Sequence, residues 1–189
     1  MGKIILGSSS PRRADILKKL NLDFEIIPSD YVEPHDLTDF SYTYVENLAY
    51  NKAMDVAQKL DIEADIIGAD TIVVINNKIL GKPKDKKEAF KMLKMLSGKT
   101  HFVVTAIAII NSKTQKSKIK STTTYVTFNN LTDEQINFYI EKFKPFDKAG
   151  SYGIQELPDG FVKSVDGSLE NVIGLPSETL LEMLKISYN

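Results

Sequence analysis

The most constraining feature of the chain is an apolar run that carries a carboxylate in its middle. Residues 66–75 read IIGADTIVVI, and the β-branched residues around Asp70 and Thr71 are typical of a buried strand. A carboxylate in such a strand is costly unless a metal or another cation pairs with it, so we interpret Asp70 as a candidate functional residue. The simpler alternative is that Asp70 and Thr71 only end one strand.

Strand and helix patterns alternate along the whole chain, which favours an α/β fold. Parallel and antiparallel connections are both expected, so we predict a mixed, twisted sheet with helices packed on it. Asn76 and Asn77 tolerate positive φ and predict a hairpin turn, and Thr132 with Gln135 forms a capping-box pattern. The expected strands span residues 3–7, 24–28, 65–75, 78–80, 101–111, 118–129 and 161–165, and the expected helices span residues 10–20, 41–60, 86–96, 132–142 and 176–186.

Length and charge limit the classes of function. A chain of 189 residues suits a single domain over residues 1–189, and a formal net charge of −1 disfavours broad nucleic-acid binding. The lack of Cys excludes disulfides and thiolate metal sites, while His35 and His101 are too far apart for a helical zinc pair. We see no signal peptide and no run long enough to span a bilayer, so we expect a cytoplasmic protein.

A second polar cluster, residues 8–13 (SSSPRR), directly follows the first expected strand. A strand, a hydroxyl-rich loop and a helix N-terminus direct backbone N–H groups and a positive dipole end toward one point. Ser10 is the expected N-cap, with Pro11 at the first helical position. The dipole disfavours Arg12 and Arg13 in the first turn, so a bound anion explains them better than helix stability does. The alternative is two solvated arginines.

Two lysines and a glutamate are further candidates. Lys52 occupies the apolar stripe of its expected helix, where it either snorkels outward or meets a buried anion. Lys82, in the rigid GKP turn after the hairpin, either reaches the same cleft or is solvated. Glu33 lies in a polar loop and could join Asp70 on a divalent cation such as magnesium, although a loop glutamate is usually only solvated.

The segment at residues 147–155 (DKAGSYGIQ) carries the last candidate. Its two glycines lie within four residues and imply special backbone geometry or close approach to a ligand. The planar amide of Gln155 offers a donor and an acceptor, which can complement the N3–H and O4 edge of uracil or thymine. Tyr152 could stack on a base, but a core position is favoured.

Together these segments resemble the Maf family of nucleoside triphosphate pyrophosphatases over nearly the whole chain. Seven short motifs in order make the resemblance specific, although each is weak alone. Two positions depart from the family pattern: Pro34, where a second acidic residue is frequent, and Glu156, where glycine often follows the glutamine. The matching segments lie at residues 8–13, 48–53, 68–71, 81–83, 97–105, 148–155 and 174–176.

The resemblance implies an α/β fold like that of inosine triphosphate pyrophosphatases, with an elongated sheet and a central cleft between two lobes. It implies hydrolysis of a nucleoside triphosphate to the monophosphate and pyrophosphate, a reaction that would remove unwanted nucleotides from the pool. The ADT and GIQ segments resemble the branch that acts on dTTP and UTP. Asp70 matches the catalytic aspartate, and Arg12, Thr71 and Gln155 match positions tied to substrate choice. The other candidate substrate-binding residues are Ser8, Ser10, Arg13, Lys52 and Lys82, and the candidate ligands of a magnesium or manganese ion are Glu33 and Asp70.

Other functions are weighed against this enzyme. The rival is a nucleotide-binding regulatory protein linked to septum formation, with which the family is also associated. Asp70 argues against pure binding, because a carboxylate would repel a triphosphate. An RNA-binding module is disfavoured by the charge balance and by the lack of a basic stripe with interleaved aromatics. A homodimer is left open.

Overall fold

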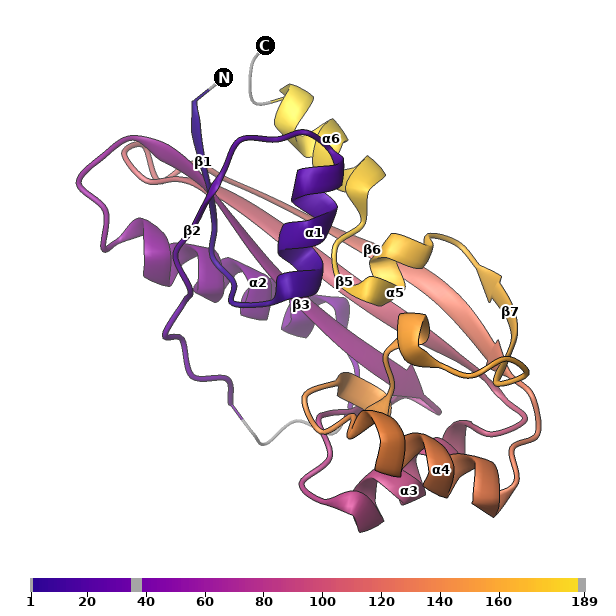
Figure 1. The fold of residues 1–189 in the computed structure, drawn as a ribbon. Helices are drawn as coiled ribbons and strands as arrows, with labels where there is room; N and C mark the ends of the chain where they lie inside the picture. Colours follow the sequence, from indigo (N-terminus) through magenta and orange to yellow (C-terminus); the bar gives the residue numbers. More distant parts are fainter. Residues whose placement is uncertain (1, 35–38, 187–189) are drawn as a thin grey trace.

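A computed structural model describes residues 2–34 and 39–186 of the protein (Figure 1). Within them one seven-stranded sheet has the order β2-β1-β3-β5-β6-β7, and β4 pairs with the C-terminal end of β3. β1 is parallel to β2 and to β3, and the other pairings are antiparallel, so the predicted mixed sheet is confirmed. The strands are β1 (Lys3–Leu6), β2 (Glu25–Ile26), β3 (Ala64–Ile75), β4 (Lys78–Leu80), β5 (Thr100–Asn111), β6 (Ser117–Phe128) and β7 (Val162–Asp166).

Helices cover both faces of the sheet. In Figure 1, α1, α5 and α6 lie on the near face, α2 lies behind the sheet, and α3 and α4 pack together at the end away from the two termini. No helix among the described residues is long and apolar enough to cross a membrane. The helices are α1 (Pro11–Lys19), α2 (Tyr42–Ala57), α3 (Lys86–Leu96), α4 (Asp133–Phe143), α5 (Leu169–Ile173) and α6 (Ser177–Ile186), with 3₁₀ turns η1 (Ala149–Ser151) and η2 (Ile154–Glu156).

Most expected elements are present within a few residues of their predicted bounds. Asn76 and Asn77 have φ of 51° and 63°, as the hairpin requires, and Thr132 with Gln135 forms the complete capping box. Ser10 stands at the N-cap position of α1 and Pro11 begins the helix, as predicted, although the Ser10 side chain makes no capping hydrogen bond.

The main differences in extent have local causes. The strand expected over residues 24–28 shortens to Glu25–Ile26, because it pairs only with the last two residues of β1. The helix expected to reach residue 60 ends at Ala57, with Gln58 as its C-cap. The five-residue helix α5 was not predicted, since one turn and a half is too short to show a helical period.

Gly68 sets the distance between α2 and the sheet. A Cβ atom on this residue would lie 2.4 Å from the carbonyl oxygen of Ala49 and 2.7 Å from the amide nitrogen of Ala53. These contacts are closer than real Cβ atoms tolerate, so only glycine allows α2 to lie this close to β3. Lys52, next to Ala53 on the helix, is thereby brought down onto the strand that carries Asp70.

The sheet has an open edge in the middle of β3. β1 pairs with residues 64–67 of this strand and β4 pairs with residues 73–75. Among the described residues no strand pairs with residues 68–72 on that side, and Asp70 and Thr71 lie in this gap. Because successive strand residues point to opposite faces, the gap lets side chains from both faces contribute to one site.

Candidate active site

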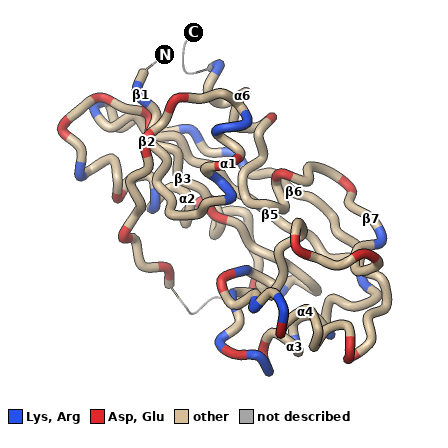
Figure 2. The backbone as a smooth tube through the Cα atoms, in the orientation of Figure 1, with Lys and Arg blue, Asp and Glu red and all other residues tan. Residues whose placement is uncertain are grey.

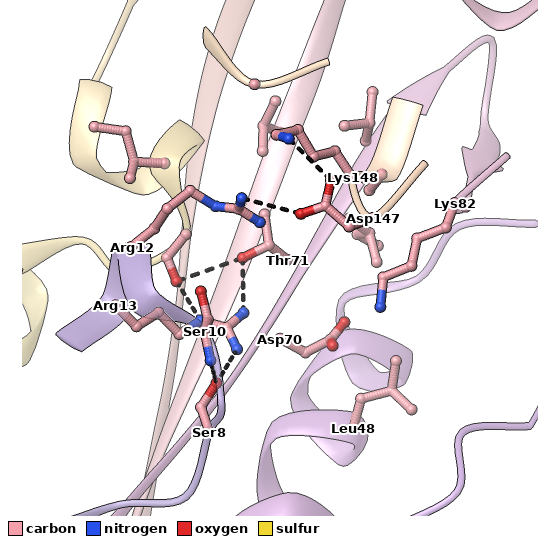
Figure 3. A pocket seen from close by; sticks show the side chains of 18 of the residues that line it. Ser8, Ser10, Arg12, Arg13, Leu48, Asp70, Thr71, Lys82, Asp147 and Lys148 are labelled. Atoms are coloured by element: carbon pink, nitrogen blue, oxygen red, sulfur yellow. Dashed lines mark hydrogen bonds and ion pairs between the residues drawn. The ribbon is translucent and has the colours of Figure 1, made fainter. Parts of the chain in front are cut away.

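A cleft of about 990 Å³ opens at the gap beside β3. It collects every residue that the sequence predicted to bind substrate or metal, from segments far apart in the chain (Figure 3). The structure therefore brings these side chains together around one cleft. Those residues are Ser8, Ser10, Arg12, Arg13, Glu33, Lys52, Asp70, Thr71, Lys82 and Gln155.

An acidic pair around one lysine forms one side of the cleft. The Lys52 ammonium donates to Asp70 Oδ1 at 2.5 Å and to Glu33 Oε1 at 2.7 Å. Asp70 is only 6% exposed, so Lys52 meets a buried anion rather than snorkelling outward. Burial by itself would raise the pKa of Glu33, but the Lys52 hydrogen bond and the charges of Lys52, Lys82 and Arg13 lower that pKa overall. Glu33 therefore stays ionised at neutral pH.

The same two carboxylates fit a divalent cation. One oxygen of each carboxylate contacts the Lys52 ammonium. The two negative charges therefore face the same point, and that point attracts cations. Magnesium is often held by one or two carboxylates together with substrate phosphates and water. Among the described residues no three His, Asp or Glu side chains gather as a complete metal cage, so such an ion would need further oxygens from the substrate or water.

Arg13 is bound by protein oxygens in the wall of the cleft. Its Nε donates to the Gly174 carbonyl at 2.9 Å, Nη1 to Ser8 Oγ at 3.1 Å, and Nη2 to Thr71 Oγ1 at 3.2 Å (Figure 3). Burial lowers the pKa of Arg13, and the nearby Asp70 charge opposes that decrease. Arg13 is therefore not a solvated arginine, since its partners come from the loop before α1, from β3 and from the C-cap of α5; its predicted role in anion binding stays a prediction.

Arg12 crosses the cleft to a different element. Its Nη1 lies 3.3 Å from Asp147 Oδ2, and Asp147 also accepts from the Lys148 ammonium at 2.9 Å. Lys148 is buried and lies 3.1 Å from Glu156 Oε2. Asp147 and Lys148 were not singled out as cleft residues by the sequence prediction, although Lys148 opens the KAG motif. The carboxylate that departs from the family pattern, Glu156, is neutralised by this lysine.

Lys82 and Gln155 are the exposed members of the site. Figure 3 shows the Lys82 side chain extending into the cleft on the side of Asp70. Gln155 lines the cleft from η2, and its amide makes no hydrogen bond to another described residue. The Thr71 hydroxyl contacts Arg13 and Thr105, at 3.2 Å and 2.9 Å, and not this amide. The Gln155 amide is therefore available to a ligand.

The remaining polar candidates belong to the core. Tyr152 is 6% exposed, and its hydroxyl lies 2.7 Å from His101 Nε2, which agrees with the favoured core position. Burial lowers the pKa of His101 to about 4, so the ring is neutral at physiological pH. His35 lies outside the described residues. Basic and acidic residues are interspersed along the backbone (Figure 2), in keeping with the predicted lack of a basic stripe for nucleic acid.

The chain was compared with known proteins. It is 48% identical over 176 residues to a "dTTP/UTP pyrophosphatase" of Alkaliphilus oremlandii, covering 93% of this chain and 91% of that protein. It is 46% identical over 187 residues to a protein of the same name from Thermoanaerobacter sp., covering 99% and 97%.

Solved structures show the same fold at low identity. The HAM1 protein of Coxiella burnetii is 19% identical with a TM-score of 0.52, covering 100% of this chain and 98% of that one. The Ham1 protein of Staphylococcus aureus is 15% identical with a TM-score of 0.52, covering 99% and 100%. The expected α/β fold class is confirmed by this likeness.

The family model for Maf-like proteins matches residues 3–186. On this match and these identities, the chain belongs to the Maf family.

Proposed function

We propose that this protein hydrolyses dTTP and UTP to the nucleoside monophosphate and pyrophosphate. The observation that carries the proposal is the buried Asp70 at an open cleft, paired with Lys52 and faced by further cations. The printed names of the relatives that cover nearly the whole chain support both the reaction and the two substrates. Hydrolysis of these nucleotides would serve to remove unwanted species from the nucleotide pool.

Asp70 is the group that handles the attacking water. A water oxygen forms a bond to the α-phosphorus, and the bond from that phosphorus to the bridging oxygen breaks, so that pyrophosphate leaves. The water proton passes to Asp70, whose carboxylate accepts a hydrogen bond from the Lys52 ammonium. Lys52 holds the carboxylate in place and stabilises its charge until the proton arrives.

Cations on both sides of the cleft neutralise the phosphate chain. Phosphoryl chemistry depends mostly on positioning and charge stabilisation, and Arg12, which is paired with Asp147, and the exposed Lys82 supply positive groups at the cleft. Arg13 acts differently, because three of its five N–H donors are engaged by protein oxygens; it holds Ser8 and Thr71 in place. A magnesium or manganese ion held by Glu33 and Asp70 would add charge neutralisation for the leaving pyrophosphate.

Gln155 selects the base. Its amide lines the cleft without a partner among the described residues, and it can accept from N3–H while donating to O4 of uracil or thymine. CTP presents an acceptor at N3 and a donor at N4, so it leaves both groups unpaired when the amide is held in this one orientation. Selection of the two keto pyrimidines therefore requires contacts made on substrate binding to fix the amide, because no described residue holds it beforehand.

The regulatory alternative is not favoured. A site built only to hold a triphosphate has no use for a buried carboxylate, and the similar proteins are named as pyrophosphatases.

We propose further that residues 1–189 act as one domain, because the cleft takes its walls from both ends of the chain, and that the protein works in the cytoplasm.

Product analysis with Asp70→Asn tests the proposal. The wild-type protein with magnesium should release monophosphate and pyrophosphate from dTTP and UTP. Asp70→Asn should lose about 10²–10⁴-fold in kcat while still binding nucleotide, the range expected of a positioned base. Asp65→Asn, on the same strand but outside the cleft, is the matched control and should stay active. Orthophosphate release, or an active Asp70→Asn protein, would exclude the assignment.

A further inference from the structure

The loop that presents Glu33 has little apolar anchorage. After β2 the chain runs along α2 toward the cleft, and only Ile27 packs against the apolar cluster beneath α2. Val32 is 79% exposed, and the Glu33 side chain is 42% exposed. Apolar burial therefore cannot fix the position of Glu33, so polar contacts must hold the loop.

Asp55 on α2 is the centre of those contacts. Its Oδ2 accepts from the Ser29 hydroxyl at 2.9 Å, from the Asp30 amide at 2.8 Å and from the Lys59 ammonium at 2.9 Å. Lys59 also reaches Asp30 Oδ2 at 2.8 Å, which closes the cluster. The Ser29 hydroxyl in turn accepts from the Tyr31 amide at 3.0 Å, so one carboxylate organises three consecutive loop residues.

The same face of α2 then binds the rest of the loop. Asn51 Nδ2 donates to the Tyr31 hydroxyl at 3.1 Å, and Lys52 donates to Glu33 at 2.7 Å. Residues 51, 52 and 55 lie within one helical turn, so they meet the loop on neighbouring positions of one surface. Asp55 fixes the start of the loop on α2, and Lys52 binds the Glu33 carboxylate at the other end of this segment.

We infer that Asp55 is a positioning residue that acts on the reaction through Glu33. This inference rests on the proposed role of Glu33 in the active site. Asp55 does not line the cleft, so it has no direct contact to offer a substrate there. Its charged partners Lys59 and Asp30 are 44% and 87% exposed, and ion pairs at the surface contribute little to global stability, so loss of Asp55 should loosen the loop rather than unfold the protein.

Three single variants test the contacts that Asp55 makes with Ser29, Asp30 and Lys59. Asp55→Ala removes all its side-chain hydrogen bonds, and Asp55→Asn keeps one acceptor oxygen. Asp15→Ala removes an exposed carboxylate of α1 that, within the described part of the chain, pairs only with Lys18 of the same helix. Asp55→Ala should lower kcat/KM for dTTP roughly tenfold, mainly through kcat, since a small displacement of a positioned group is enough. It should also speed amide hydrogen exchange at Asp30 and Tyr31 about tenfold with little change in Tm. Asp55→Asn should recover part of both effects, and Asp15→Ala should show neither.

A double-mutant cycle with Glu33→Gln tests the route of action. If Asp55 acts through Glu33, adding Asp55→Ala to Glu33→Gln should change kcat/KM less than about twofold. Fully additive losses would overturn the inference, as would unchanged exchange and activity in Asp55→Ala. If Asp55→Ala failed to fold, Ser29→Ala would remove one of the hydrogen bonds to Asp55. It should change kcat/KM and amide exchange in the same directions as Asp55→Ala, by smaller amounts. A fully active Glu33→Gln protein would instead refute the proposed role of Glu33, which is a separate failure.

Discussion

Replacing Gly68 with Ala should separate α2 from β3. The new Cβ would lie 2.4 Å from the Ala49 carbonyl oxygen and 2.7 Å from the Ala53 amide nitrogen, whereas ordinary contact begins at 3.4 Å. Both atoms are helix backbone and cannot turn aside as a flexible side chain would. The helix must therefore retreat by about 1 Å.

This retreat acts on stability and on catalysis together. Overpacking of this kind costs about 1–3 kcal/mol, or roughly 2–12 °C in Tm for a chain of this size. Lys52 moves with the helix, so its distance to Asp70 should lengthen from 2.5 Å to about 3.5 Å, the limit of a hydrogen bond. A misplacement of this size should lower kcat/KM for dTTP by about 10- to 100-fold.

Thermal unfolding and steady-state kinetics with dTTP measure the two effects. Gly81→Ala is the control for stability, because a Cβ there meets nothing within 4 Å. A Gly68→Ala protein with wild-type Tm and kcat/KM would refute the packing argument. A lowered Tm with unchanged kcat/KM would keep the packing but refute the claim that the helix positions Lys52 for catalysis.

Three further outcomes are expected. Gln155→Glu should reduce the preference for dTTP and UTP over CTP at least tenfold, since each unpaired polar group costs about 1–3 kcal/mol; unchanged kcat/KM ratios with an intact circular dichroism spectrum would exclude this residue as the base reader. Lys82→Met should raise KM for dTTP roughly tenfold, with Lys82→Arg restoring part of it and added salt shrinking the difference; equal KM values at low salt would show that Lys82 does not bind phosphate. His101 has its pKa lowered by burial to about 4, so as pH falls from about 6.5 to 4 the unfolded state takes up a proton before the folded state does. Wild-type stability should then fall by up to about 3 kcal/mol more than that of His101→Gln in denaturant titrations across this range, and parallel curves would contradict the assignment.

Local sequence determined most of the secondary structure of this protein. The paired asparagines 76–77, the Thr132 capping box and the β-branched run around Asp70 each act through neighbours a few residues away. Such short-range preferences can be read without knowing the fold. The motifs at residues 8–13, 68–71 and 148–155 also indicated the candidate site residues, because hydroxyl, carboxylate and amide groups at these spacings suit phosphate and base recognition.

Only the tertiary structure decided what those residues contact. The sequence alone favoured snorkelling for Lys52, and its contact with Asp70 depends on the close approach of α2 that Gly68 permits. Arg13 was interpreted as an anion ligand, but its partner Gly174 is 161 residues away in the chain. The cleft itself exists because β1 and β4 leave residues 68–72 of β3 without a partner strand on one side. Contacts of this kind join distant segments, so their energies depend on the packed fold and are absent from any local pattern.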